Sequence, residues 1–297
     1  MHFFEKGKEF LCLSYSLECI TYLLFLTRNL VDETWYTFGM IKRTPPLIVG
    51  NWKSTPNTKE EAIKFIKALE KKITTSKVKL PKKSYYLAVP EIFIPILTPL
   101  AKHGYIGAEN IPGYKEGQET GATTAKQLAS GGASFAVIAH SEVRRRGEKV
   151  EERKEKVTQA LTLGLTAVLC FGENTRDKEG KYLEELEGDV KATLTGIKRE
   201  LFASLVIAYE PVWAIGASTP ATANECFEAV IAIRRALASL AGIDHAKKVH
   251  VLYGGTVTKD TALSFLEEGG VNGLLLGRAS QEATSFFETI LSAYKGK

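Results

Sequence analysis

The sequence has few cysteines and no pattern typical of a metal centre. Of its 297 residues, four are cysteine and five are histidine. No CxxC pair occurs, and no histidine cluster of zinc-ligand spacing accompanies the cysteines, which are Cys12, Cys19, Cys170 and Cys226. We therefore expect no metal and no cofactor. Cysteines of this kind fit a reduced, cytoplasmic compartment best.

Two ligand-binding patterns are missing as well. Gly50 to Lys53, at the end of the first apolar run, read GNWK and do not resemble the GxGxxG turn of a doubly wound open sheet. The basic stretch from Lys64 to Lys83 has no interleaved surface aromatics, so we expect no nucleic-acid binding. The net charge is +5, and residues 1–39 carry three basic and five acidic side chains, so the remainder carries +7. This balance favours anionic small molecules as ligands.

Residues 1–39 differ from the rest of the chain. The stretch from Leu11 to Leu26 is almost wholly apolar or hydroxylic and is interrupted by Glu18. A signal peptide would need a small-x-small cleavage site, which is missing, and a membrane span would have to bury Glu18. We favour a third interpretation, in which Met40 is the start and residues 1–39 are a leader or an appendage, because the regular pattern begins directly after them. We expect no membrane association unless this extension acts as an anchor.

From Ile41 onward, short apolar runs alternate with amphipathic helical runs. Each short run is apolar on both faces, as in parallel strands buried on two sides. The predicted strands are 47–52, 85–89, 104–108, 135–139, 167–171, 205–209, 249–253 and 273–276. The helical runs between them have apolar residues at intervals of three and four and include 59–73, 148–163, 182–201, 225–240 and 258–268. Asn57 and Thr58, followed by Glu60 and Glu61, resemble a helix N-cap.

The number and size of these units predict a single (β/α)₈ barrel domain over residues 40–297. Eight units in roughly 257 residues match the typical size of this fold. No linker divides the region. Because the C-terminal ends of all strands surround one mouth in such a barrel, polar residues that follow the strands are expected to converge there.

The polar residues at these strand ends form a short list. Asn51 and Lys53 follow the first strand and, on an extended segment, can point toward the same face. The others, after strands four and six, are His140, Ser141, Glu142 and Glu210. A lone lysine in such a position is usually solvated. The whole set places an ammonium group, an imidazole and carboxylates at one mouth.

His140 alone would more often be an ordinary capped strand end than a catalytic group. Ser141 and Glu142 can cap a short helical turn that contains Arg144 and Arg145, which brings backbone donors near the imidazole. Such donors disfavour the protonated ring. A neutral imidazole can still donate a hydrogen bond.

Glycines follow the last two predicted strands. Gly254 and Gly255 after the seventh, and Gly277 after the eighth, expose backbone N–H groups where barrels of this kind commonly bind phosphate. The alternative for each is a tight turn. With Glu210 as a base and His140 as a neutral donor, the set suits enolisation, in which a proton leaves the carbon beside a polarised carbonyl.

Several motifs resemble those of the triosephosphate isomerase family, and the resemblance covers Ile41 to Tyr294. In family order, the chain has GNWK at 50–53, AHSE at 139–142, AYEPVWAIG at 208–216 and YGGTV at 253–257, with a weaker echo in CFGE at 170–173. The resemblance implies reversible interconversion of D-glyceraldehyde 3-phosphate and dihydroxyacetone phosphate, in glycolysis and gluconeogenesis. No metal or cofactor is implied.

The resemblance also implies a role for each mouth residue. Glu210 would transfer the proton, while His140, supported by Ser141, would polarise the substrate oxygens. Lys53, held by Glu142, would balance the negative charge of the enediolate and the phosphate. Asn51 would help to orient the substrate and His140. The phosphate would be bound through the backbone amides of Gly216, Thr256, Gly277 and Arg278. A lid would comprise Pro211, Val212, Trp213, Ala214, Ile215, Gly216 and Ala217.

The chain departs from the family pattern at several positions. Ala139 stands where the family usually has glycine. Pro220 lies in the far hinge of the lid and predicts altered lid kinetics rather than lost activity. The family is usually dimeric, and Thr120 matches the tip of the loop that enters the neighbour. Ala122 and Val143 replace a Glu and an Arg that commonly face each other there, so we expect a homodimer with a less ionic interface.

Two other functions compete with this interpretation. Another phosphosugar enzyme of the same fold, such as an aldolase, would share the phosphate site but would need a different catalytic group, such as a Schiff-base lysine. A barrel used only for binding would have lost Glu210 or His140, and both are present.

Overall fold

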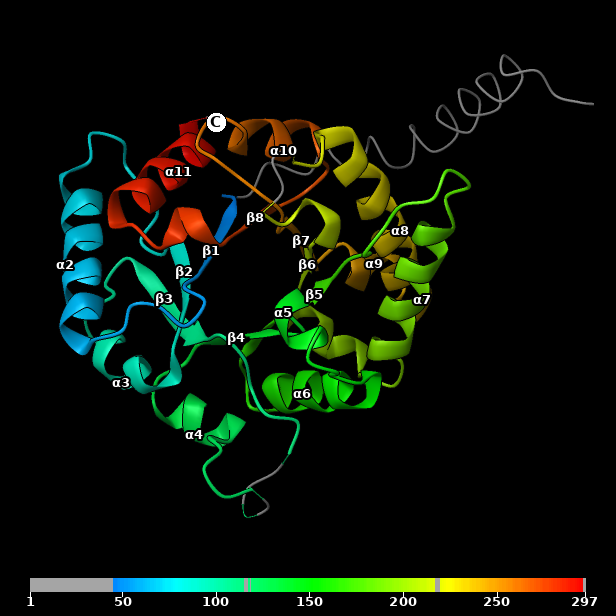
Figure 1. Cartoon of the computed structure of the whole chain (residues 1–297), viewed down its shortest axis with the longest axis horizontal. Helices are drawn as coiled ribbons and strands as arrows, with labels where there is room; N and C mark the ends of the chain where they lie inside the picture. Colours follow the sequence, from blue (N-terminus) through cyan, green and yellow to red (C-terminus); the bar gives the residue numbers. More distant parts are fainter. Residues whose placement is uncertain (1–44, 115–116, 118, 217–219, 296–297) are drawn as a thin grey trace, which may run out of the picture. The chain divides into compact units, whose positions relative to one another are not determined.

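The computed structural model describes residues 45–114, 117, 119–216 and 220–295. The predicted (β/α)₈ barrel is confirmed, because eight parallel strands close on themselves in the order of the sequence. Figure 1 shows the helices in a ring around them. The strands are β1 (Leu47–Asn51), β2 (Tyr85–Val89), β3 (Gly104–Ala108), β4 (Phe135–Ile138), β5 (Thr166–Phe171), β6 (Leu205–Tyr209), β7 (His250–Tyr253) and β8 (Gly273–Leu276). The extension at residues 1–39 lies outside the described residues.

The α-helices alternate with these strands. They are α2 (Lys59–Thr75), α3 (Ile94–Leu97), α4 (Ala125–Ser130), α5 (Ser141–Arg144), α6 (Val150–Thr162), α7 (Lys181–Leu194), α8 (Ala223–Ala241), α9 (Ile243–Ala246), α10 (Ala262–Glu268) and α11 (Ala283–Lys295). Short 3₁₀ turns occur at η1 (Glu91–Phe93), η2 (Arg199–Ser204), η3 (Val212–Ala214) and η4 (Arg278–Ser280). Within the described ranges, none of these helices is long and apolar enough to cross a membrane.

Helix boundaries follow local capping chemistry. The predicted N-cap of α2 is Thr58, which also forms a capping box with Glu61. The predicted helix 182–201 was too long, because α7 ends at Leu194. Thr195 leaves the helix with a ψ of 125°, and Gly196 follows with a left-handed φ of 86°. The predicted helix 258–268 begins only at Ala262. Thr258 and Thr261 instead bond to each other's backbone N–H groups and form a turn before it.

The strands bury both faces, and successive side chains alternate between two cores. Residues such as Val49, Val137 and Leu252 fill the barrel interior. Their neighbours, such as Ile48 and Ile138, belong to the larger core, which also contains the inner faces of the helices. This two-sided burial explains why each strand is an unbroken apolar run.

Closure between β8 and β1 depends on Gly273, which pairs with Leu47. A Cβ on Gly273 would lie 2.0 Å from the Leu47 carbonyl oxygen. We expect Gly273→Ala to destabilise the barrel by about 1–3 kcal/mol, because backbone must move to accept the methyl group. Urea unfolding monitored by circular dichroism measures the effect.

Gly188 in α7 is the matched control, since a Cβ there would meet no atom within 4 Å. Gly188→Ala should stabilise the protein by about 0.5–1 kcal/mol, because alanine has the higher helix propensity. Equal effects of the two substitutions would contradict the role given to Gly273.

Candidate active site

Glu210 directly follows β6 and is 1% exposed. Its backbone N–H donates to the Phe171 carbonyl at 2.6 Å, which continues the β5–β6 ladder by one residue. Two glycines make room for it. A Cβ on Gly172 would lie 1.8 Å from the Glu210 carbonyl oxygen, and a Cβ on Gly254 would lie 2.9 Å from Glu210 Cγ. The sequence therefore delivers a carboxylate to a buried position at the barrel mouth.

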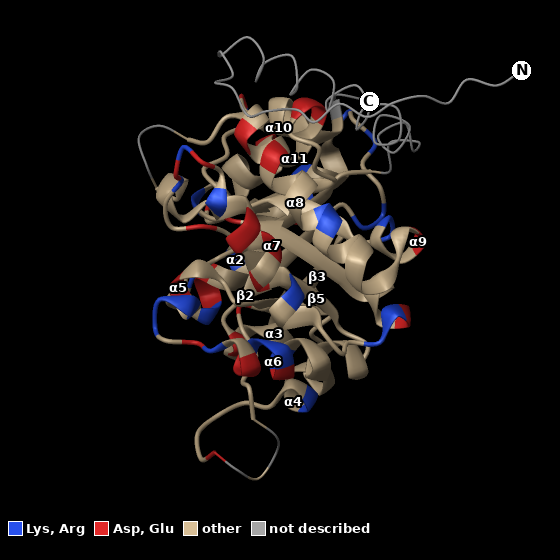
Figure 2. Cartoon of the chain, turned by 90° about the vertical axis from the view of Figure 1, so that its right-hand side faces the viewer, with Lys and Arg blue, Asp and Glu red and all other residues tan. Residues whose placement is uncertain are grey.

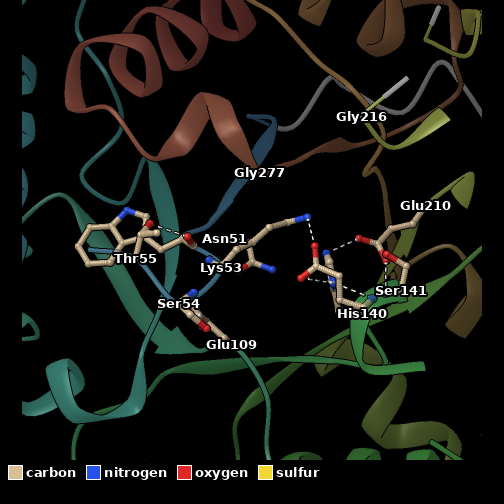
Figure 3. Close-up of polar contacts among 12 residues, drawn as sticks. Asn51, Lys53, Ser54, Thr55, Glu109, His140, Ser141, Glu210, Gly216 and Gly277 are labelled. Carbon is tan, nitrogen blue, oxygen red and sulfur yellow. Dashed lines mark hydrogen bonds and ion pairs between the residues drawn. The ribbon is translucent and has the colours of Figure 1, made fainter. Parts of the chain in front are cut away.

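The Glu210 carboxylate is held by two donors from the β4 end. His140 Nε2 lies 3.1 Å from Oε1, and the Ser141 N–H donates to Oε2 at 3.0 Å. Figure 3 shows the His140 and Glu210 side chains facing each other. Burial raises the pKa of Glu210, but the adjacent His140, the Ser141 N–H and Arg144 outweigh burial, so the pKa lies below its ordinary value. Glu210 is ionised at neutral pH and can act as a base.

Hydrogen bonding fixes which nitrogen of His140 carries a proton. The residue is the N-cap of α5, and its Nδ1 accepts from the Glu142 backbone N–H at 3.2 Å. Nδ1 is therefore unprotonated, and the ring hydrogen is on Nε2, which faces Glu210. The predicted backbone donor beside the imidazole is confirmed. The cap itself is the imidazole rather than Ser141 or Glu142.

Lys53 extends from the end of β1 toward the same pair (Figure 3). Its Nζ lies 2.9 Å from Glu142 Oε1, so the predicted contact between Lys53 and Glu142 is confirmed. Partial burial raises the pKa of Glu142, but the bond to Lys53 and the positive charge of Lys53 lower it below the ordinary value. A Cβ on Gly277 would lie 3.3 Å from Lys53 Cε, which puts the ammonium beside the turn after β8.

The backbone at Lys53 is not extended, contrary to the sequence-based expectation. Lys53 and Ser54 have left-handed φ values of 54° and 61°. The Lys53 N–H donates to Asn51 Oδ1 at 3.0 Å. The Ser54 N–H lies 3.0 Å from both carboxylate oxygens of Glu109, which follows β3. Glu109 thus holds the strained turn that aims Lys53, and no motif in the sequence pointed to it.

Glu109 makes stability depend on pH. Burial raises its pKa to about 7, despite the lowering effect of the Ser54 N–H. As pH rises from the ordinary value of 4.5 to about 7, the unfolded chain has lost this proton while the folded chain retains it, so stability falls. We expect Glu109→Gln to stabilise the protein by about 1–3 kcal/mol more at about pH 8 than at about pH 5.

Urea unfolding of both proteins at the two pH values measures this difference. Glu185→Gln, which changes an exposed carboxylate on α7, is the matched control and should behave alike at both pH values. A Glu109→Gln effect independent of pH would show that Glu109 is ionised throughout.

The segment after Glu210 is tied to the turn after β7. The Thr256 hydroxyl donates to the Ala214 carbonyl at 3.1 Å and accepts from the Gly216 N–H at 3.3 Å. Gly216 has a φ of 72°, a conformation that suits glycine. Figure 3 places Gly216 on the same side of the mouth as Gly277. Of the predicted lid, Pro211 to Gly216 are described, and Ala217 lies outside the described residues.

The base of this segment is anchored by Glu173, in the weakest of the five motifs. Its Oε1 accepts from Tyr209 OH at 2.8 Å, Trp213 Nε1 at 2.9 Å and Arg176 Nε at 2.9 Å. The Arg176 guanidinium also lies over the Trp213 ring at 5.2 Å. The sequence did not predict this role for Glu173, because Tyr209 and Trp213 lie more than 30 residues away.

The glycines after β7 and β8 differ in what their backbones can offer. The Gly254 N–H donates to the Tyr209 carbonyl at 2.7 Å, so this hydrogen is already used and the glycine serves to make space for Glu210. Gly255 is also required by packing, since a Cβ would lie 2.2 Å from Tyr253 OH. Gly277 precedes η4, which begins with the exposed Arg278.

Backbone strain also occurs directly before His140. Ala139 has a φ of 58°, which costs an alanine about 1–2 kcal/mol and costs glycine little. This explains why glycine is the usual residue at this position of the motif. The left-handed turn points the chain from β4 into α5 and so presents the imidazole to the mouth.

A closed parallel barrel with a carboxylate, a neutral imidazole and a lysine at the C-terminal ends of its strands defines a (β/α)₈ enzyme. The triosephosphate isomerase family model matches residues 46–293. A triosephosphate isomerase of Streptococcus pyogenes serotype M49 is 36% identical over 245 residues, which are 81% of this chain and 95% of the relative. One from Clostridium botulinum, strain Loch Maree, is 33% identical over 242 residues, or 81% and 96% of the two chains. The chain belongs to the triosephosphate isomerase family.

Proposed function

We propose that this protein reversibly interconverts D-glyceraldehyde 3-phosphate and dihydroxyacetone phosphate through an enediolate. Family membership supports the reaction, and one observation supports the chemistry. The buried Glu210 carboxylate and the Nε2–H of His140 meet at 3.1 Å at the barrel mouth, opposite Lys53. A base and a neutral hydrogen-bond donor are the two groups that enolisation of a carbonyl compound needs.

Glu210 is proposed to carry the proton between adjacent carbons of the substrate. Both carboxylate oxygens are engaged by His140 and Ser141 in the described conformation. A substrate carbonyl that accepts from His140 Nε2 would release one of them. The freed carboxylate would take a proton from one carbon and return it to the next. The hydroxyl proton would move from one substrate oxygen to the other beside His140 Nε2, and together the two transfers convert the ketose into the aldose.

His140 is proposed to polarise the substrate oxygens as a neutral donor. The Glu142 N–H occupies Nδ1, so the ring can present only Nε2–H to a substrate without gaining a second proton. Triosephosphate isomerase is itself the standard example of a neutral histidine used in this way. Asn51, which is 4% exposed and bonded to the Lys53 N–H, is proposed to help orient the substrate.

Lys53 is proposed to balance the charge of the enediolate and of the phosphate. Its side chain runs beside Gly277. The backbone amides proposed to bind the phosphate belong to Gly216, Gly255, Thr256, Gly277 and Arg278. The Gly216 N–H would exchange the Thr256 hydroxyl for the phosphate. Residues 211–221 are proposed to close over the substrate and exclude water, and the effect of Pro220 on that motion stays a prediction. Because Lys53 Nζ is paired with Glu142, a Schiff-base mechanism has no support.

A coupled assay of the two triose phosphates tests the function directly. We expect the full chain and a chain beginning at Met40 to interconvert them at equal rates, since residues 1–39 contribute no group to the proposed chemistry. An inactive chain beginning at Met40 would show that residues 1–39 are needed for activity and would overturn the domain boundary at residue 39. We assign the reaction to glycolysis and gluconeogenesis in the cytoplasm.

We also propose a homodimer built around the segment between β3 and α4. The described parts of this segment project away from the barrel (Figures 1 and 2), and Thr120 there is exposed. Ile92 in η1 is 68% exposed, and Glu91 beside it accepts from the Thr123 hydroxyl at 2.9 Å. An exposed isoleucine next to a projecting segment fits a surface that a second copy covers.

Light scattering at micromolar protein tests the dimer. We expect the mass of two chains, and we expect Ile92→Glu to shift it toward one chain because a charge would be buried at the contact. Ile243→Glu, at an isoleucine that is 55% exposed on α9, is the matched control and should leave the mass unchanged. A monomeric wild type would refute the proposal.

A further inference from the structure

One sector of the barrel has far more basic than acidic residues, and the proposed chemistry does not use it. This lysine-rich sector consists of two segments. Residues 67–83 comprise the C-terminal half of α2 and the loop that leads to β2, and residues 98–103 directly precede β3. It contains eight lysines and a single glutamate, Glu70. Since residues 40–297 carry a net charge of +7, the sector alone accounts for that excess, and the rest of the barrel is balanced.

Three of these lysines converge on a hollow. A cavity of about 330 Å³ is lined by Lys67, Glu70, Lys71, Thr74, Leu100 and Lys102. Its volume lies in the range of small-ligand sites, about 300–1,000 Å³. Lys67 and Lys71 are four residues apart and therefore on one face of α2, which Figure 1 shows at the outer edge of the molecule next to α3.

The three ammonium groups have no counter-charge of their own. Within the described ranges, the Nζ atoms of Lys67, Lys71 and Lys102 make no hydrogen bond or ion pair. The carboxylate of Glu70 is engaged elsewhere: Oε1 accepts from Tyr85 OH at 2.7 Å and from the His103 N–H at 3.0 Å, and Oε2 lies 2.5 Å from His103 Nδ1. Like charges held around one hollow without a partner raise the local concentration of anions.

We propose that this cavity binds a small oligophosphate, such as inorganic triphosphate or the phosphate chain of a nucleotide. Several ammonium groups can neutralise successive phosphates, with the other lysines of the sector adding to the field. A concave site favours a compact anion over a flat lipid surface. Leu100 supplies an apolar wall that the nucleoside part of a nucleotide could contact.

The cavity is remote from the barrel mouth. Its residues precede β2 and β3, whereas Glu210 and His140 follow β6 and β4, so the two sites lie at opposite ends of the strands. A strand of five residues, such as β3, spans roughly 17 Å. Oligophosphate binding at the cavity should therefore not compete with substrate.

Isothermal titration of the full chain with inorganic triphosphate, in metal-free buffer of low ionic strength, tests the proposal. We expect binding that weakens with added salt and that Lys71→Glu/Lys102→Glu weakens by at least about tenfold. Lys248→Glu is the matched control, because it reverses an exposed lysine at the same end of the barrel, before β7. It should change the affinity by less than about twofold.

Two further measurements separate the cavity from other anion sites. The Lys53→Met variant should still bind triphosphate, since Lys53 belongs to the mouth, and kcat/KM of the Lys71→Glu/Lys102→Glu variant should equal that of the wild type. No binding at millimolar triphosphate, equal weakening by Lys248→Glu, or loss of binding in Lys53→Met would overturn the proposal. Binding of phosphatidylserine vesicles without binding of triphosphate would overturn it too.

Discussion

Replacement of Glu210 by glutamine is expected to lower kcat by about 10³-fold or more, with little change in KM. The amide keeps the shape of the side chain, and its oxygen can still accept from the Ser141 N–H, but its NH₂ group would face the Nε2–H of His140 and it cannot accept the substrate proton. The loss therefore falls on the chemical step rather than on binding. Initial rates in the coupled assay, over a range of substrate concentrations, separate the two parameters.

The control for this experiment is Glu185→Gln, which removes an exposed carboxylate from α7. It should have wild-type kinetics, and circular dichroism should show both variants folded. A Glu210→Gln variant with wild-type kcat would mean that another group takes the proton.

Lys53→Met is expected to lower kcat/KM by about 10²–10³-fold, with a raised KM. The ammonium group is the charge proposed to serve both the phosphate and the developing enediolate, so its loss weakens ground-state and transition-state binding together. Unlike Glu210→Gln, this substitution should therefore change both kinetic parameters. It also leaves the Glu142 carboxylate without its partner at 2.9 Å.

Lys181→Met, at an exposed lysine on α7, is the matched control and should be fully active. Added salt should weaken substrate binding by wild type more than by Lys53→Met, because the lost charge is the one that salt screens. If the Lys53→Met variant had the kcat/KM of the wild type, Lys53 would have no part in the mechanism.

The strands were predictable because a strand buried on both faces needs apolar residues at consecutive positions, which appear in the sequence as apolar runs. Four of the predicted strand ends differ from the structure by one residue, at positions 52, 139, 166 and 249. The end of α7 before Gly196 was not anticipated, since a single glycine is compatible with a helix until its φ is known. The local hydrophobic pattern therefore predicted the positions of the helices and strands better than their boundaries.

The mouth residues were predictable because polar side chains directly after apolar strands must converge in a closed barrel. What the sequence could not show is how they are held. The left-handed turn at Lys53 and Ser54 is bonded to Glu109, which lies 55 residues after Ser54 in the sequence. Glu173 likewise accepts hydrogen bonds from Tyr209 and Trp213, which are close to it in the fold but distant in the sequence. Contacts between distant elements leave no periodic signal in one sequence.

The central claim is that Glu210 moves a proton, rather than that a hydride shifts directly between two carbons. Turnover of dihydroxyacetone phosphate in D₂O, followed by ¹H NMR, distinguishes the two. A carboxylate that holds the proton between carbons exchanges it with solvent, so we predict deuterium on the carbon beside the carbonyl, formed by wild type and not by Glu210→Gln. Product that carries no deuterium at that carbon would contradict the account.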